Sequence, residues 1–498
     1  MLVVRALEDI PSQGIRKNDE LRFYVVDAHH HMGREKSHRN TPSGAYEFYA
    51  LLWFELQRMS KDLVENGSQL FEPVRVEAVP VVEKLFASDE SWSSSRIGWL
   101  VDRTIVFPYN DDYSRTGYPA NPSFQVSNDR IAGWTTRAPN SARLIGFARV
   151  DPNDEKSTPG QAVGELHRAV RTLGLRGLKL HPLSQLFVDE MTDNPVLDVV
   201  SAAGLLGVPV IFDTRNIRTA RKIAEIAKLV EARTKGAPVP PLIVAHCGMS
   251  PGDPGLYETL LNPHLYAETS TLHGNDIPVL FRMAHERLGT RGRNWAEKLL
   301  FGTDYSFLSV QAVEVILYLL SRDFPGNATD IQRILGGNAL SLAQKSIGGE
   351  SGQERKPVHL VVRSREGSMR DTLESTLISV IHSNDWDLCS IDFMKPPRGT
   401  WPEVRPGVDG GFNGVYLGSY VMTVVKRANQ RRLQIWVHEQ AGSPLTCSLM
   451  DAGGPVALAT LELASQAMNP ELLSSLSQNS TRVETPEGMK QAITKMLT

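Results

Sequence analysis

Four apolar segments of this chain each end in His or Asp and are followed at once by a turn-forming residue. They are VVDAHHHMG (25–33), GLKLHP (177–182), LIVAHCG (242–248) and LLFGTDYSF (299–307). Buried parallel strands have this pattern, with the polar residue at the C-terminal end. An eight-stranded β/α barrel gathers those ends around one mouth, so the segments predict a barrel whose site is built from several strands.

The first segment carries two histidines that can bind one metal ion. Side chains alternate along a strand, so we expect Asp27, His29 and His31 on one face and His30 on the other. Imidazole is a good ligand for zinc and similar ions, so His29 and His31 become candidate metal ligands. A surface histidine run or a tag remnant is the alternative, but this run lies inside a strand-like segment. We interpret His30 as a packing residue or a residue behind the ligands.

Two later strand ends supply candidate catalytic residues. Asp304 ends LLFGTD, where its carboxylate could bind the metal and take a proton from a bound water. His246 ends LIVAH, where a neutral imidazole could act as a base or polarise the substrate. The alternatives are a helix cap for Asp304 and a buried core residue for His246. We expect His246 to be in phase with Val244, and Asp304 with Gly302.

The fourth and fifth predicted strands add three candidates. GLKLHP places Lys179 and His181 on one face, with His181 nearer the mouth as a metal ligand or a substrate contact. Lys179 suits a buried ion pair or a substrate contact better than a carbamylated lysine between two metals. LGVPVIFDT (206–214) ends in Asp213, which could bind zinc or manganese or cap the next helix. We predict Asp213 as a metal ligand and the other two as substrate contacts.

From about residue 24 to residue 343, the chain resembles the amidohydrolase superfamily in its amidohydrolase-related branch. The segments that carry the resemblance are, in family order, DAHHH (27–31), ARLIGFARVDP (142–152), GLKLHP, VAHCG (244–248), FGTDYSF (301–307) and ILGGNALSL (334–342). That branch contains non-oxidative aromatic decarboxylases and hydrolases of lactones and amides. The resemblance implies a (β/α)8 barrel with one catalytic divalent metal.

Position by position, the resemblance implies that His29, His31 and Asp304 bind the metal and that His246 is the catalytic histidine. Asp213 departs from the family pattern, because relatives usually read PVxxHT with a His ligand and this chain reads PVIFDT. The departure leaves open whether Asp213 or His181 completes the site. Zinc is the expected metal, with manganese or another divalent ion as the alternative.

Composition restricts the partners and the compartment. A formal net charge of −3 argues against a general nucleic-acid or membrane surface. Three cysteines far apart in the chain predict a reducing compartment without a disulfide framework, and the N-terminal apolar run is too short for a signal peptide. We therefore expect a cytoplasmic protein, a homodimer that acts on a small molecule, with no apolar stretch long enough to span a bilayer.

The predicted organisation is α/β, a (β/α)8 TIM-like barrel over residues 1–344 followed by a smaller α+β domain over 358–498. A Gly-, Ser- and charge-rich linker covers 345–357, and an insertion at 32–100 carries two helices. The barrel strands are expected near 23–31, 102–109, 144–150, 176–181, 208–213, 241–246, 265–271 and 298–304. Helices are expected near 44–65, 77–87, 158–173, 194–205, 218–232, 309–322 and 327–344. The second domain is expected to contain a strand at 356–365, a helix at 371–382, a hairpin of 414–427 with 431–440, and helices near 455–474 and 486–497.

The leading functional hypothesis is a metal-dependent hydrolase of a C–N or C–O bond in a small molecule, such as an amide or lactone. The alternative is a non-oxidative decarboxylase, which also needs an arginine for the substrate carboxylate; Arg137, Arg149 and Arg215 are candidates. A third hypothesis is a barrel that has lost catalysis and serves as a scaffold, motivated by the aspartate at 213.

Overall fold

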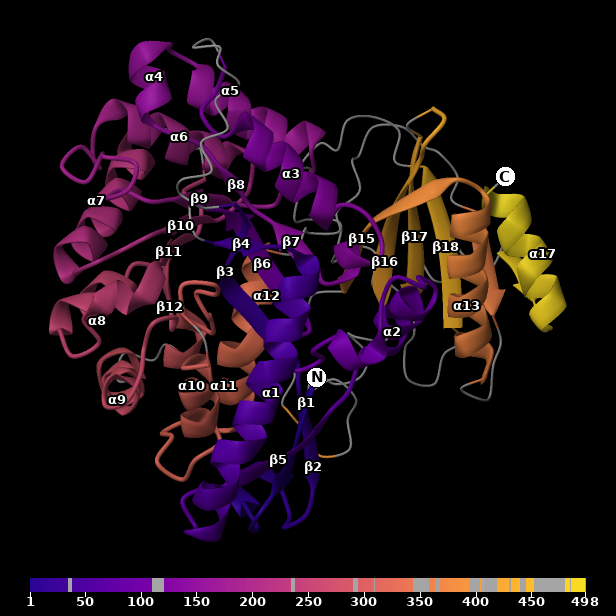
Figure 1. Ribbon diagram of the computed structural model, residues 1–498, viewed down its shortest axis with the longest axis horizontal. Helices are drawn as coiled ribbons and strands as arrows, with labels where there is room; N and C mark the ends of the chain where they lie inside the picture. Colours follow the sequence, from indigo (N-terminus) through magenta and orange to yellow (C-terminus); the bar gives the residue numbers. More distant parts are fainter. Residues whose placement is uncertain are drawn as a thin grey trace.

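The structure is a computed structural model of the 498-residue chain (Figure 1). It describes residues 1–34, 38–109, 121–233, 238–289, 294–308, 310–343, 358–362, 368–393, 404, 406, 419–429, 431–438, 445–451, 480–483 and 485–497. Among these residues, no helix is both long enough and apolar enough to cross a membrane.

Eight strand positions follow one another in the order predicted for a β/α barrel (Figure 1). They are β3 (Val26–Arg34), β6 (Arg103–Pro108), the pair β7 (Leu144–Gly146) and β8 (Ala148–Arg149), β9 (Leu178–Leu180), β10 (Val210–Phe212), β11 (Leu242–Val244), β12 (Leu265–Glu268) and β13 (Leu299–Leu300). Successive strands pair in parallel within two sheets, one running from β3 to β7 and the other from β8 to β13. The predicted mixed α/β architecture is confirmed.

Backbone hydrogen bonds connect the two sheets at both of their ends. Between β7 and β8, the Phe147 amide donates to Val106 (2.8 Å) and the Ala148 amide donates to Gly177 (2.8 Å). Beyond β13, the Phe301 carbonyl accepts from the Ala28 amide of β3 (2.9 Å).

The helices alternate with these strands. Their bounds are α1 (Pro42–Glu65), α2 (Pro80–Ala87), α3 (Gln125–Thr135), α4 (Asn153–Ser157), α5 (Gln161–His167), α6 (Asn194–Leu205), α7 (Ile217–Arg233), α8 (Pro254–Leu260), α9 (Asp276–Gly289), α10 (Ala312–Leu319), α11 (Ala328–Gln332) and α12 (Asn338–Ala343). In α7 the buried residues Ile223, Ile226, Ala227 and Val230 recur every three or four positions, which gives this helix one buried face. The helix predicted near 158–173 is shorter: α5 ends at His167, and a single π-helical turn follows it.

Several predicted strands are wrong in extent. The first begins at Val26, and Phe23 belongs to a separate strand, β2 (Glu20–Phe23). The sixth ends at Val244, and the eighth covers only Leu299–Leu300. The polar residues therefore lie in turns beyond the strands, and the predicted strand phase of His246 and Asp304 is incorrect.

A small antiparallel sheet at the N-terminus was missed. Strand β1 (Leu2–Ala6) pairs with β2 on one side and with β5 (Phe71–Val76) on the other. The insertion at 32–100 therefore contributes β5 as well as α1 and α2. Pairing partners about seventy positions apart leave no local signal in the sequence.

In the described residues after 357, the C-terminal domain has a six-stranded sheet and two helices. Its strands are β14 (Val358–Val362), β15 (Trp386–Phe393), β16 (Tyr420–Lys426), β17 (Arg432–His438), β18 (Leu445–Asp451) and β19 (Ser480–Val483), in the order β15-β16-β17-β18-β14-β19. The predicted hairpin is confirmed as β16 and β17, and the predicted helices as α13 (Ser368–Ser383) and α17 (Pro486–Leu497). The predicted linker and the helix near 455–474 lie outside the described residues.

The C-terminal domain contacts the N-terminal ends of the parallel strands. Arg176, which precedes β9, forms a buried ion pair with Asp392 of β15, and Arg103 at the start of β6 lies 3.8 Å from the same carboxylate. The Ser141 hydroxyl, which precedes β7, donates to the Leu388 carbonyl (2.7 Å). A second contact joins α2 to α13, where Lys84 pairs with the buried carboxylate of Glu374 (2.7 Å).

Candidate metal centre

Strand β3 directs His29 and His31 to one side and His30 to the other, as predicted, but Asp27 lies with His30. The pairing register of β3 with β6 shifts between Asp27 and His30, and a bulge of this kind turns the side chains that flank it. The Asp27 carboxylate accepts from the Tyr49 hydroxyl (2.8 Å) and lies 3.2 Å from His30 Nδ1. The prediction that Asp27 shares a face with His29 and His31 is therefore wrong.

His29 and His31 lie together in a buried cluster with Asp304. One Asp304 carboxylate oxygen lies 3.2 Å from His31 Nε2 and 3.4 Å from His29 Nε2. Asp304 has a left-handed backbone (φ 55°), and its amide donates to the His29 carbonyl, which fixes the turn against β3. Burial alone would raise the pKa of the Asp304 carboxyl, but the nearby His29 and the hydrogen bond with His31 hold it below its ordinary value.

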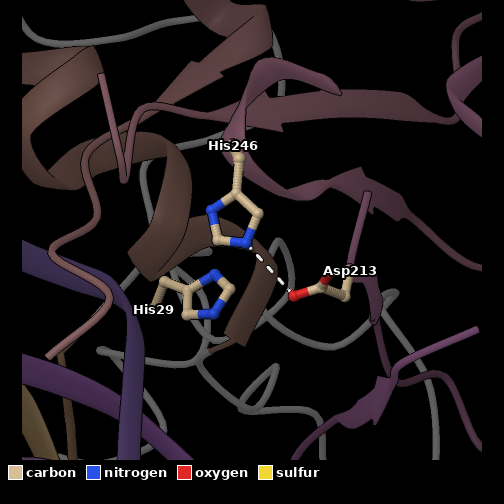
Figure 2. Close-up of side chains that lie close together, drawn as sticks. All are labelled: His29, Asp213 and His246. Atoms are coloured by element: carbon tan, nitrogen blue, oxygen red, sulfur yellow. Dashed lines mark hydrogen bonds and ion pairs between the residues drawn. The ribbon is translucent and has the colours of Figure 1, made fainter. Parts of the chain in front are cut away.

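His246 and Asp213 form a second group with His29 (Figure 2). Figure 2 shows His246 and Asp213 pointing toward each other, and His246 Nε2 is 3.1 Å from an Asp213 carboxylate oxygen. His246 follows β11 in a left-handed conformation (φ 58°), and its ring lies 4.8 Å from that of His29. Burial lowers the pKa of His246, but the hydrogen bond and charge of Asp213 outweigh it and raise this pKa above the ordinary value.

The other two predicted contacts, Lys179 and His181, border the same cluster. Lys179 Nζ lies 3.2 Å from His29 Nε2 and 3.7 Å from Asp213, and burial lowers the pKa of this lysine to about 8. His181 Nε2 lies 3.4 Å from the other Asp213 oxygen, and burial lowers the pKa of His181 to about 3. Asp213 also accepts from the half-exposed Arg215 (3.0 Å).

Glu268 is a site residue that the sequence analysis missed. It ends β12, is fully buried, and its carboxylate lies 2.9 Å from His29 Nδ1. The same carboxylate accepts from the backbone amides of His246 (2.7 Å) and Ser270 (2.6 Å). The predicted strand extended to residue 271, which placed Glu268 in mid-strand, whereas the other candidates were found at strand ends.

His30 belongs to a second polar cluster on the opposite side of β3. Its Nε2 accepts from the Asn40 amide (2.8 Å), and its Nδ1 lies 3.0 Å from the Tyr49 hydroxyl. The Asp27 carboxylate joins this cluster to the turn after β13, because it accepts hydrogen bonds from the amide and hydroxyl of Thr303 (3.0 and 2.6 Å). The position of His30 behind β3 matches its interpretation as a residue behind the ligands.

The donor atoms fit a divalent metal. Two groups, His29–Asp213–His246 and His29–His31–Asp304, each offer three ligand atoms within 4.8 Å of one another, and all five residues are buried. Imidazole nitrogens with carboxylate oxygens are the donors that zinc and related ions prefer. The nearby Lys179 ammonium adds a positive charge beside these donors, so the lysine borders the metal position rather than completing it.

The mouth of the site is aromatic. The rings of Phe107, Tyr109 and Phe307 all lie about 5 Å from that of His31. A neighbouring pocket of about 410 Å³ is lined by His38, Arg39, Tyr305, Ser306, Phe307, Leu308 and Gln311.

The three arginines considered for a substrate carboxylate lie in different places. Arg149 ends β8, is buried and donates to the Pro108 carbonyl (2.9 Å). Arg215 lies beside Asp213, whereas Arg137 is exposed between α3 and β7, where the strands begin. Arg149 and Arg215 therefore remain candidates, and Arg137 is far from the strand ends that form the site.

Comparison with known proteins gives a family match that begins after β6 and ends in α12. Residues 117–342 match the family model described as amidohydrolase, whereas no curated protein matches the chain. The chain is similar to 2,6-dihydroxybenzoate decarboxylase from Rhizobium (16% identity, 64% of this chain, 98% of that chain, TM-score 0.38). It is also similar to a protein described as amidohydrolase II (13%, 64%, 99%, 0.38) and to an uncharacterised TIM-barrel protein from Bordetella bronchiseptica (15%, 64%, 98%, 0.36).

Proposed function

Since the chain belongs, through residues 117–342, to the amidohydrolase superfamily, we propose that it is a metal-dependent hydrolase of a C–N or C–O bond in a small molecule. The observation that carries the proposal is the buried convergence, from four strand ends, of five side chains that could bind a metal. Desolvating that many ionisable groups is costly unless they are paired or bind an ion, and such clusters mark functional sites.

We also infer that the two sheets form one closed barrel. The hydrogen bonds between β3 and the segment after β13, together with those between β7 and β8, support this arrangement. In a closed barrel every candidate ligand reaches the same mouth, as its position at a C-terminal strand end requires.

The proposed ligands are His29, His31, Asp304 and Asp213, and zinc is the proposed metal. When bound, such an ion polarises a substrate oxygen and lowers the pKa of water. His246 and Asp304 can hold the proton that an attacking water gives up, and return it to the leaving nitrogen or oxygen. Lys179 and His181 border the cluster and would contact the polar groups of the substrate.

Decarboxylation of a small aromatic or unsaturated acid is the second candidate. It is favoured by two cationic side chains beside the cluster, the ammonium of Lys179 and the buried guanidinium of Arg149. A carboxylate substrate would be held by these two cations, and the carbon that loses carbon dioxide would take a proton from His246.

The test begins with metal analysis of the purified full chain, for which we expect one divalent ion per chain. Panels of lactones, amides and carboxyl-labelled aromatic acids are then offered to the metal-bound protein. Hydrolysis products support the leading proposal, and labelled carbon dioxide supports the alternative. A folded protein that binds no divalent ion would overturn both and favour the scaffold hypothesis.

A further inference from the structure

The Glu268 carboxylate is shared by the two histidines closest to each other in the cluster. Its Oε1 lies 2.9 Å from His29 Nδ1 and accepts from the His246 amide (2.7 Å) and the Ser270 hydroxyl (2.8 Å). Its Oε2 accepts from the Ser270 amide (2.6 Å). All four residues are almost completely buried.

An ionised carboxylate only accepts hydrogen bonds. Both oxygens of Glu268 accept hydrogen bonds from backbone amides, Oε1 from His246 and Oε2 from Ser270, which is the arrangement that suits a charged carboxylate. The His29 nitrogen that faces Glu268 is therefore the one that carries hydrogen. The Nε2 of a neutral His29 then has a lone pair directed at Asp304 and Lys179.

The same reasoning reaches His246 through Ser270. The serine hydroxyl has one hydrogen, and it lies between Glu268 Oε1 (2.8 Å) and His246 Nδ1 (2.8 Å). If that hydrogen pointed at His246, the hydroxyl oxygen would face the carboxylate with no hydrogen between them. The hydrogen therefore goes to Glu268, and His246 Nδ1 must donate to the serine oxygen.

We propose that Glu268 is the positioning residue for both imidazoles of the centre, directly for His29 and through Ser270 for His246. It fixes the tautomer of each ring so that both Nε2 lone pairs point into the cluster. For His246, that lone pair faces the Asp213 oxygen at 3.1 Å, and only a proton or a metal ion can lie favourably between two acceptors. The inference deepens the proposed function, on which it rests for the role of the metal.

Gly302 provides the space that this arrangement needs. A Cβ at position 302 would lie 2.5 Å from Glu268 Oε2 and 3.1 Å from the His29 Cβ. Any side chain there would push the carboxylate away from its donors, which explains a glycine between Phe301 and Thr303.

The experiment compares four variants of the full chain. Glu268→Gln places an amide against the donating Ser270 amide. Ser270→Ala removes the hydroxyl that joins Glu268 to His246 and leaves the direct contact of Glu268 with His29. Ser270→Thr restores the hydroxyl. Thr269→Val is the matched control, because the buried Thr269 hydroxyl has no hydrogen-bond partner among the described residues.

Histidine-selective ¹⁵N NMR reads the tautomers, with His246→Gln used to assign the signal. We expect His246 Nδ1 to carry hydrogen in the wild type, in Ser270→Thr and in Thr269→Val, and to lose it in part in Ser270→Ala. An unchanged His246 signal in Ser270→Ala would overturn the proposed relay, in which Glu268 acts through Ser270 on His246.

Zinc titration against a competing chelator separates the two roles of Glu268: the direct arm is its contact with His29, and the indirect arm is its link through Ser270 to His246. We expect Glu268→Gln to weaken zinc binding about 10- to 100-fold, the usual effect of losing a partner that orients a ligand, and Ser270→Ala to leave it nearly unchanged. Equal zinc affinity in Glu268→Gln and the wild type would overturn the direct arm. With a substrate, Ser270→Ala should lower kcat at constant KM, and Ser270→Thr should restore it.

These readouts also separate this inference from the proposed function. Tautomers are measured without substrate, so a relay seen in a protein that hydrolyses nothing would refute the function and leave the positioning role. A working zinc hydrolase whose histidine tautomers exchange freely would support the function and refute the positioning role.

Discussion

Successive side chains of β3 serve two polar clusters on opposite sides of the strand. His29 and His31 face Asp304, whereas Asp27 and His30 face Tyr49. The bulge between β3 and β6 brings Asp27 into the second cluster, which a regular alternation would not allow.

The first prediction concerns the three histidines of this strand. His29→Ala and His31→Ala should each lose most of the bound metal, whereas His30→Ala should keep it. His30→Ala should instead lower the free energy of unfolding by about 1–3 kcal/mol, because it leaves buried partners in Asn40 and Asp27 unpaired. Metal analysis and urea unfolding measure the two effects, and loss of metal from a folded His30→Ala would contradict the assignment.

The second prediction concerns acid stability and Glu268. Its pKa falls from 4.5 to about 2 in the folded state, so its contribution is present above pH 4.5 and is lost as the pH falls toward 2. At neutral pH that contribution is about 3 kcal/mol, as an order of magnitude. Glu268→Gln should therefore be less stable than the wild type at neutral pH, and the difference should shrink through this acid window.

Urea unfolding of chelator-treated protein at several pH values measures this difference, since metal release then plays no part. The prediction would be contradicted if the difference in free energy of unfolding between Glu268→Gln and the wild type stayed constant down to pH 2. Protonation of Glu268 would then not affect the stability of the folded protein.

Much of the candidate site could be predicted from single residues. Seven residues chosen from the ends of apolar segments lie in one buried cluster, because parallel strands bring those ends together. Their roles as ligands and contacts stay predictions. Glu268 was missed because a carboxylate that binds only protein groups has no spacing rule to identify it.

The turns after β11 and β13 control where the ligands point. His246 and Asp304 have left-handed backbones, which non-glycine residues rarely adopt and which hydrophobic alternation cannot predict. By contrast, α6 and α7 were predicted within one residue at each end, because a buried stripe with a period of 3.6 is a local signal.

The third prediction concerns the strand β15 and its contact with the barrel. Asp392→Asn should lower the free energy of unfolding by about 3–5 kcal/mol, because it leaves two buried guanidinium groups, Arg176 and Arg103, without a counter-charge. Asp385→Asn is the matched control, since its pair with Arg427 is mostly exposed and should contribute little. Equal unfolding midpoints for the two variants in guanidinium chloride would contradict the prediction.

The whole molecule separates the candidate site from the C-terminal domain. The cluster lies where the barrel strands end, whereas the domain contacts residues where they begin, such as Ser141 and Arg176. All the proposed ligands lie before residue 305, so the C-terminal domain supplies none of them.

The fourth prediction follows from this separation. A fragment of residues 1–343 should fold and bind the same amount of metal per chain as the full protein. Its Tm should be lower, because the contacts of Arg176, Ser141 and Lys84 with the C-terminal domain are lost. Circular dichroism and metal analysis test both statements, and a folded fragment without metal would show that the domain shapes the site from a distance.

Because side chains on both faces of β3 make polar contacts, few substitutions in this strand should be tolerated. In an ordinary surface strand every second codon is free to vary, whereas here Asp27, His29, His30 and His31 all make polar contacts and Ala28 is fully buried. A saturation library read by deep sequencing should therefore show one uninterrupted window of depleted substitutions at positions 27–31, with no alternating pattern inside it. Directed evolution of this protein for new activity would have to vary residues near the C-terminal ends of the other strands.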